Sequence, residues 1–282
     1  MSAHTRPSLE ALIALARDAG REIMAVRDAG AAAHRKDDGS PVTEADQRAE
    51  ALILAGLARL APGAPVLAEE AYAAGHRPDL SAGPHFFCVD ALDGTKDFLA
   101  EGDGGSFTVN IAWIEAGRPV VGVVYAPALG DLFAGAEGQG ALRGAFDART
   151  GAERAALSPI RVANRAAPPW RIAASRRHGD ADTAAFIKAL GQTKEVRVSS
   201  SIKFCLTAAG EIDVYPRFGT ISEWDAAAGH AVLAAAGGVM NRLTGEPVAY
   251  GRAARDFLID GFVATGGAAA EAETRRILAA MR

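Results

Sequence analysis

The sequence has little cysteine, no excess of basic charge and no long hydrophobic run. Its two cysteines, Cys88 and Cys205, form no C-x-x-C pair, and each lies in an apolar segment, which favours buried free thiols over a disulfide. The formal net charge of −4 at pH 7 argues against binding nucleic acid through a basic face. It does not argue against a small anionic substrate, because a bound metal ion reverses the local charge of a site.

No apolar stretch reaches the ~18 residues that a membrane-spanning helix needs. The N-terminal residues, MSAHTRPSLE, lack the basic segment and apolar run of a secretory signal. The sequence also has no H-E-x-x-H zinc spacing and no G-x-S-x-G nucleophile motif. We therefore expect a cytoplasmic protein without a transmembrane segment, and a site that uses no covalent intermediate. Loose attachment to the inner face of the inner membrane stays open.

At 282 residues, of which 49% are hydrophobic, the chain is long enough for one large domain or two joined lobes. A lobe boundary is predicted near residues 158–169. Helices and strands alternate with hairpins, which indicates a layered α/β or α+β domain. Helical patterns are predicted at 8–26, from about 47 to 60, and at 183–190, 201–209, 223–236 and 270–281. Strands are predicted at 66–67, 86–89, 107–114, 119–125, 132–134, 172–174, 195–198, 212–215 and 239–240, and a loop at 71–84.

The stretch VDALDGTKDF, residues 89–98, carries the clearest chemistry. Asp90 and Asp93 follow a buried strand, and Gly94 and Thr95 come directly after them. Two carboxylates this close repel each other, and a hard divalent cation such as Mg²⁺ resolves the repulsion because it prefers oxygen ligands. Gly94 permits a close backbone approach to a ligand, and Thr95 offers a hydroxyl group. From this stretch alone, a surface turn with solvated aspartates is an equal alternative.

Acidic residues in three further segments have a structural interpretation beside the functional one. Glu69-Glu70 follows a short strand, where paired acids usually form a solvated face. Asp46 stands three residues after Thr43 and before an apolar helix, which is the pattern of a capping box. Asp225 lies in the first turn of an Ala-rich helix, where an acid favours the helix dipole. A capping role for Asp46 is compatible with a catalytic one.

Residues 90–95, DALDGT, resemble the hallmark motif of the lithium-sensitive, Mg²⁺-dependent phosphatases of the inositol monophosphatase superfamily, with Ala91 where the family usually has Pro. The continuation Lys96-Asp97-Phe98 is similar to the T-K-[ED]-F of the bacterial 3′(2′),5′-bisphosphate nucleotidases in that superfamily. The resemblance runs from about Lys36 to Gly261. It includes SPVTEAD at 40–46, EE at 69–70, SRRH at 175–178, SSSIKFC at 199–205, YPRFG at 215–219 and WDAAAG at 224–229.

The resemblance implies an α+β fold, a five-layered αβαβα sandwich of the inositol monophosphatase and fructose-bisphosphatase type. Most metal ligands would lie in an N-terminal lobe, residues 1–160, and the substrate-recognition residues in a C-terminal lobe, residues 161–282. Two or three Mg²⁺ ions per site are implied, two of which share Asp90. Glu69 and the Leu92 carbonyl would hold the first ion, and Asp93 and Asp225 the second.

The resemblance also assigns roles beside the metal ions. Asp46 and Thr95 together would accept a proton from the attacking water, and Glu70 would assist beside the ligands. A surface side chain is the local alternative for His178 and Lys203, and Ser199 stands where the family has Gly. The implied substrate contacts are Glu69, Leu92, Asp93, Gly94, Thr95, Ser175, His178, Ser199, Lys203 and Asp225.

The implied activity is removal of the 3′-phosphate from adenosine 3′,5′-bisphosphate by metal-activated water, which gives AMP and phosphate and serves sulfur assimilation. An inositol monophosphatase or fructose-1,6-bisphosphatase activity is one alternative, and a catalytically silent nucleotide-binding module is another. The complete acid set argues against the silent module, because a pure binder needs no Asp46–Thr95 pair to activate water. The expected partner is a small-molecule substrate, not nucleic acid, and both a monomer and a homodimer fit the sequence.

Overall fold

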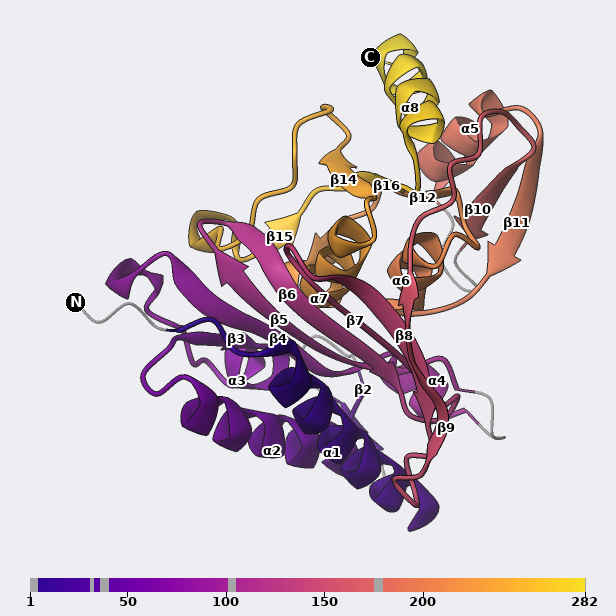
Figure 1. The fold of residues 1–282 in the computed structure, drawn as a ribbon. Coiled ribbons are helices and arrows are strands. Elements are labelled where there is room, and N and C mark those ends of the chain that lie inside the picture. Colours follow the sequence, from indigo (N-terminus) through magenta and orange to yellow (C-terminus); the bar gives the residue numbers. More distant parts are fainter. Residues whose placement is uncertain (1–4, 31–32, 36–40, 101–104, 175–179, 282) are drawn as a thin grey trace.

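The computed structural model describes residues 5–30, 33–35, 41–100, 105–174 and 180–281 (Figure 1). Within these residues the larger sheet has seven strands, which lie side by side in the same order as in the sequence. Its first two strands are parallel and the rest form an antiparallel meander. The strands are β3 (Val66–Ala68), β4 (His85–Asp93), β5 (Thr108–Glu115), β6 (Arg118–Ala126), β7 (Asp131–Ala136), β8 (Gly140–Phe146) and β9 (Glu153–Ile160).

The second sheet has five strands in the order β11-β10-β12-β16-β14. Strand β10 is parallel to both neighbours, whereas β16 is antiparallel to β12 and β14. These strands are β10 (Trp170–Ala174), β11 (Thr193–Arg197), β12 (Val214–Arg217), β14 (Val239–Arg242) and β16 (Phe262–Thr265). Two short pairs lie outside the main sheets: β1 (Ala33–Arg35) with β2 (Pro41–Thr43), and β13 (Ile221–Ser222) with β15 (Leu258–Ile259).

Helices cover both sheets in three layers (Figure 1). The first pair, α1 (Leu9–Asp28) and α2 (Glu44–Leu60), packs on the outer face of the larger sheet. The second pair, α6 (Ile202–Ala208) and α7 (Glu223–Ala235), lies between the sheets. The third pair, α5 (Ala181–Ala189) and α8 (Ala268–Ala280), covers the second sheet. The predicted five-layered α+β sandwich is therefore confirmed.

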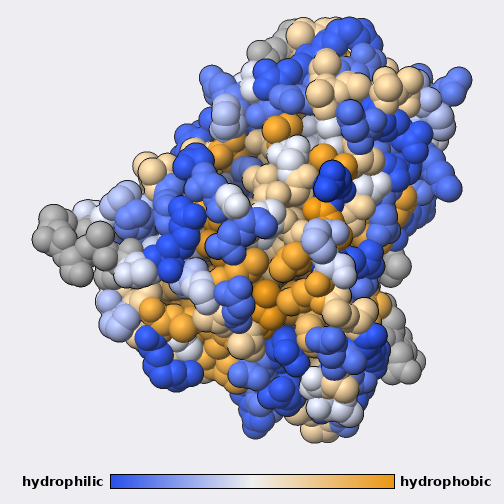
Figure 2. Space-filling model, in the orientation of Figure 1, coloured by the Kyte–Doolittle hydropathy of each residue, from blue (hydrophilic) through white to orange (hydrophobic). Residues whose placement is uncertain are grey.

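Side-chain alternation along β5 divides the core into layers. Ile111 and Trp113 face the first helical pair, while Ala112 and Ile114 face the middle layer. A third cluster around Phe186 lies under the outer helices. Figure 2 shows hydrophilic residues around the rim of one face and hydrophobic residues near its middle.

Small residues let α7 pack closely on the larger sheet. A Cβ atom at Gly122 would lie 2.5 Å from the carbonyl oxygen of Ala228, and one at Gly135 would lie 2.8 Å from the Cβ of Ala235. Because neither clash can be relieved without moving backbone or helix, the Ala-rich sequence of α7 matches the glycines opposite it. Helix α7 thus lies along β4 to β7, and Asp225 in its first turn comes close to Asp90.

Several sequence expectations need correction. Residues 71–84 are not a continuous loop, because α3 (Glu69–Ala73) and the 3₁₀ helix η1 (Leu80–Ala82) lie there. Strand β16 was not predicted, since four residues between glycines show no clear period. The 3₁₀ helix η2 (Ala253–Arg255) and the short β13–β15 pair were missed for the same reason. Strand β12 begins at Val214, two residues later than expected.

Other expectations agree with the structure. Cys88 and Cys205 are buried free cysteines. Among the described residues, no helix is both long enough and apolar enough to cross a membrane. The division into residues 1–160 and 161–282 stays a prediction: the larger sheet ends at Ile160, yet α7 from the second half packs on the strands of the first.

Candidate active site

Strand β4 and the turn after it form the centre of the site. Its register with β5 pairs Asp90 with Asn110 and Asp93 with Thr108, and shifts between these two pairs. Such an irregularity changes the direction of the side chains that follow it. Gly94 then adopts a left-handed conformation with φ 95°, and α4 (Thr95–Phe98) begins directly after it. A Cβ at Gly94 would lie 2.5 Å from the Ser200 hydroxyl oxygen, so both the backbone angle and the space favour glycine.

Three carboxylates from distant segments meet beside this turn. Glu69 from α3, Asp90 from β4 and Asp225 from α7 each offer an oxygen atom, and the three oxygens lie within 4.8 Å of one another. Burial raises the pKa of Asp90 well above its usual value, and the charges of Glu69 and the nearby aspartates raise it further. Three like charges at this separation are unfavourable unless a proton or a cation compensates them.

Asp90 itself shows how the cluster would accept a cation. The residue is 2% exposed, and its Oδ1 accepts the N–H of Leu92 at 2.9 Å. Its Oδ2 is buried and accepts no hydrogen bond from any described residue. A buried carboxylate oxygen without a donor is costly unless a metal ion binds it. The donor set is all oxygen, which suits Mg²⁺ better than a metal that prefers nitrogen or sulfur.

Asp93 lies beside this group of three and bonds toward α6. Its Oδ2 accepts the N–H of Ser201 at 3.0 Å. The Ser201 hydroxyl also donates to the backbone carbonyl of Asp225 at 2.8 Å, which joins the two segments. Burial raises the pKa of Asp93, and the positive charge of Lys203 opposes that shift. Asp93 therefore lies between the acidic cluster and a buried cation.

Asp46 and Thr95 form a second arrangement next to the cluster. The Thr95 hydroxyl donates to Asp46 Oδ1 at 3.1 Å, and the Leu92 carbonyl oxygen is 3.5 Å from the same hydroxyl. Asp46 Oδ2 accepts both the N–H and the hydroxyl of Thr43 at 2.7 Å, so the predicted capping box is confirmed. One carboxylate oxygen thus caps α2 while the other bonds to Thr95. Burial raises the pKa of Asp46, and the hydrogen bonds from Thr43 and Thr95 oppose it.

The remaining metal-site prediction also combines two roles. Asp225 forms a capping box with Ser222, whose backbone N–H donates to Asp225 Oδ2 at 3.3 Å. The helix-start interpretation is therefore correct for this residue too. Burial raises the pKa of Asp225 well above its usual value, the charge of Asp93 adds to the shift, and the charge of Arg217 opposes it.

Lys203 is more deeply buried than a surface lysine. It is 5% exposed, its Nζ donates to the Ser200 carbonyl at 2.9 Å, and the Tyr215 ring centroid is 5.3 Å from the same atom. Burial lowers the pKa of Lys203 to about 8, while the charge of Asp93 opposes this. Ser199 precedes this segment and is partly buried. Ser175 and His178 lie outside the described residues.

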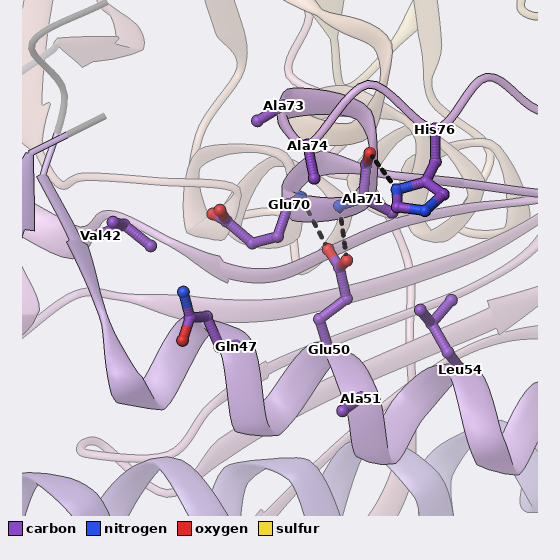
Figure 3. A pocket seen from close by; sticks show the side chains of 10 residues that line it. All are labelled: Val42, Gln47, Glu50, Ala51, Leu54, Glu70, Ala71, Ala73, Ala74 and His76. Atoms are coloured by element: carbon purple, nitrogen blue, oxygen red, sulfur yellow. Dashed lines mark hydrogen bonds between the residues drawn. The ribbon is translucent and has the colours of Figure 1, made fainter. Parts of the chain in front are cut away.

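Glu70 is oriented differently from Glu69. Figure 3 shows its carboxylate in a cleft between α2 and α3, on the side of Val42 and Gln47. Its backbone N–H donates to Glu50 Oε2 at 2.8 Å. The catalytic role assigned to Glu70 stays a prediction.

Two charged residues near the site were not singled out from the sequence. Arg217 at the end of β12 lowers the pKa of Asp93 and Asp225 through its charge; it is the one charged residue of the YPRFG motif. Glu50 is 4% exposed on α2. The sequence feature that could have identified Glu50 is its position four residues after Asp46, on the same face of the helix.

The fold and this site define a class: α+β sandwiches in which carboxylates from both halves of the chain meet beside an Asp–Thr pair. The chain belongs to the inositol monophosphatase family, whose family model matches residues 4–280. That family is metal-dependent, which agrees with the acidic cluster of this chain.

Comparison with individual proteins gives close relatives. The chain is 41% identical to the 3′(2′),5′-bisphosphate nucleotidase CysQ of Shigella flexneri over 247 residues, which cover 86% of this chain and 93% of the relative. It is 40% identical to CysQ of Salmonella typhimurium over 91% of this chain and 99% of the relative. Among solved structures, CysQ from Bacteroides thetaiotaomicron superimposes with a TM-score of 0.75 at 32% identity, over 92% of this chain and 97% of that one.

Proposed function

We propose that this protein is a Mg²⁺-dependent 3′(2′),5′-bisphosphate nucleotidase, a phosphoric monoester hydrolase. It converts adenosine 3′,5′-bisphosphate to AMP and phosphate, and so serves sulfur assimilation in the cytoplasm. The observation that carries the proposal is the Asp46–Thr95 hydrogen bond of 3.1 Å beside three carboxylates within 4.8 Å. Two relatives named as such nucleotidases, at 40% and 41% identity, support the choice of substrate.

The residues that would hold Mg²⁺ are the acids of the cluster and its neighbours. When bound, two or three ions would lower the pKa of a coordinated water and neutralise charge on the phosphate. The unpartnered, buried Oδ2 of Asp90 supports a role for this residue as a metal ligand. The proposed ligands are Glu69, Asp90, the Leu92 carbonyl, Asp93 and Asp225.

The chain itself would handle the proton of the attacking water. Thr95 donates its own proton to Asp46 Oδ1, so the lone pairs of its hydroxyl oxygen are free to accept a hydrogen bond from water. As the water attacks phosphorus, its proton moves to Thr95 Oγ1 while the Thr95 proton moves to Asp46. The raised pKa of Asp46 favours this transfer. No protein nucleophile takes part.

The opposite side of the site would bind the second phosphate. Lys203 and Arg217 place positive charge next to Asp93 and Asp225, and a buried phosphate needs such a counter-charge. An inositol monophosphate has no second phosphate to use it. The nucleoside contacts of Ser175, His178 and Ser199 remain predictions. The close nucleotidase relatives do not favour an inositol monophosphatase, a fructose-1,6-bisphosphatase or a silent binding module.

A substrate panel tests the proposal. Phosphate release is measured from adenosine 3′,5′-bisphosphate, inositol 1-phosphate and fructose 1,6-bisphosphate, with Mg²⁺, with excess chelator, and with Li⁺ added to Mg²⁺. We expect the highest kcat/KM on the adenosine bisphosphate, no turnover with chelator, and inhibition by Li⁺ that does not fade as substrate rises. A preference for inositol 1-phosphate would overturn the substrate assignment, and turnover with chelator would overturn the metal dependence.

A further inference from the structure

Helix α3 begins without a cap of its own. The free N–H groups of a helix's first turn need acceptors, but its N-cap residue, Ala68, has no side chain that can accept. Glu50 of α2 supplies the acceptors instead. Its Oε2 accepts the N–H of Glu70 at 2.8 Å, and its Oε1 accepts the N–H of Ala71 at 2.7 Å. A buried carboxylate from another helix thus caps the turn that starts with Glu69, one of the three clustered acids.

The two hydrogen bonds from α3 to Glu50 cross a cleft between α2 and α3. Figure 3 shows α2 and α3 facing each other, with the two dashed bonds from Glu50 running between them. The cleft has a volume of about 640 Å³. Small side chains line much of it, so they contribute little contact across it; they are Ala51, Ala71, Ala73 and Ala74. Hydrogen bonding to the Glu50 carboxylate therefore helps to fix the first turn of α3, beside the packing of Tyr72 on Trp224 and Phe257.

The same helix also carries the water-activating residue. Asp46 precedes Glu50 by one helical turn, so both side chains project from one face of α2. Asp46 bonds to Thr95, and Glu50 bonds to the turn that contains Glu69. A rigid helix therefore connects the two parts of the site that must act on the same water molecule.

We infer that Glu50 is a positioning residue of the active site, which holds Glu69 against Asp90 and Asp225 and in a defined relation to Asp46. Charge-assisted hydrogen bonds to a buried carboxylate are stronger than neutral ones, and leaving either N–H unpaired is costly. Loss of a group that orients a metal ligand typically weakens metal binding by about 10- to 100-fold. This inference rests on the metal-dependent function proposed above.

The test is Glu50→Gln, which keeps the size of the side chain. Its amide oxygen can accept one of the two N–H groups, of Glu70 or Ala71, but its NH₂ group cannot accept the other. Mn²⁺ binding is measured by calorimetry on protein without substrate, and the Mg²⁺ dependence of kcat is measured in parallel. We expect about 10-fold weaker Mn²⁺ binding and a similar rise in the Mg²⁺ concentration for half-maximal activity. At saturating Mg²⁺, the KM for adenosine 3′,5′-bisphosphate should stay close to wild type.

Asp213→Asn is the matched control. Asp213 is also a buried carboxylate, 1% exposed, and its Oδ2 accepts the backbone N–H of Arg171 at 2.8 Å, but it precedes β12 at the end away from Arg217. This variant should lower the melting temperature and leave Mn²⁺ affinity unchanged. If Glu50→Gln behaves in the same way, Glu50 is merely structural and the inference is wrong.

A second variant covers poor folding of the first. Glu50→Asp keeps the charge but is one methylene shorter, so it should also weaken Mn²⁺ binding, and wild-type affinity in this variant would overturn the inference. The metal-binding measurement separates this inference from the proposed activity. A wild-type protein that binds Mn²⁺ but hydrolyses none of the panel would refute the nucleotidase, while weaker Mn²⁺ binding by Glu50→Gln would still support the role of Glu50.

Discussion

The two sides of the candidate site carry opposite charge, and burial acts on both. On one side, burial and mutual repulsion raise the pKa of Asp90 and Asp225. On the other side, burial lowers the pKa of Lys203 to about 8. Each side therefore holds charges that are unfavourable in the protein alone. In the proposed function, a divalent cation would relieve the repulsion on the acidic side, and a phosphate group would pair with the charge on the basic side.

Asp93 connects the two sides. It adds negative charge to the acidic cluster, yet it accepts the N–H of Ser201 and faces the charge of Lys203. We therefore expect metal binding and substrate choice to be separable at most positions and coupled at Asp93. The following variants test that separation.

The largest effect is expected on the acidic side, for Asp225→Asn. Activity should fall by about 10³-fold or more, because several kcal/mol of charge stabilisation depend on a complete metal site. With chelator present, the melting temperature of the variant should be higher than that of the wild type, because one of three repelling charges is removed. The measurements are kcat at saturating Mg²⁺ and thermal unfolding. Full turnover by this variant would remove Asp225 from the site.

The next effect concerns the proton acceptor. Thr95→Ala and Asp46→Asn should lower kcat by about 10²- to 10³-fold and leave the Mg²⁺ dependence nearly unchanged, because they act on the water. Thr43→Ala is the comparison: it breaks the same capping box, at a cost of about 1 kcal/mol, and removes one hydrogen bond to Asp46 but leaves the Asp46–Thr95 bond, so kcat should fall much less. Asp46→Asn with normal kcat and only a lower melting temperature would show that Asp46 is a cap alone.

On the basic side, Lys203→Met keeps the apolar stem and removes the charge. The KM for adenosine 3′,5′-bisphosphate should rise about 10-fold, as expected for a lost charge-assisted contact, while turnover of inositol 1-phosphate changes little. Because the pKa of Lys203 is about 8, the wild-type KM should also rise from pH 8 to pH 9, and the variant should lack this rise. An equal loss on both substrates would mean that Lys203 supports Asp93.

The smallest effect lies away from both sides, at His230 on α7. Its Nδ1 is 3.0 Å from the Tyr250 hydroxyl, and burial lowers its pKa to about 4. The unfolded chain takes up this proton near pH 6.5, so stability is lost as the pH falls from about 6.5 toward 4. Urea unfolding at pH 7 and 5 should show a loss about 1–2 kcal/mol larger in wild type than in His230→Gln. Equal losses would contradict the buried, neutral state of His230, and kcat at pH 7 is expected to stay unchanged.

Local chemistry made much of this protein predictable. The capping boxes at Thr43 and Ser222 act within four residues, and Gly94, expected to permit a close backbone approach, adopts a left-handed conformation after strand β4. Apolar runs located the central strands. Strand β16 was not predicted from the sequence, because its four residues form a strand by pairing with β12 and β14 and show no pattern of their own. The burial of Lys203 was not predicted either, because a lysine in a helix is usually exposed.

The sequence by itself determined which short segments carry acids next to turns and helix starts, because those features depend on neighbours along the chain. Only the tertiary structure decided that Glu69, Asp90 and Asp225 meet within 4.8 Å. Their convergence accompanies two contacts: α7 lies against the glycines of β6 and β7, and the first turn of α3 donates two hydrogen bonds to Glu50. Such contacts join residues far apart in the chain, and their free energy comes from burial and hydrogen bonds that form when the layers assemble.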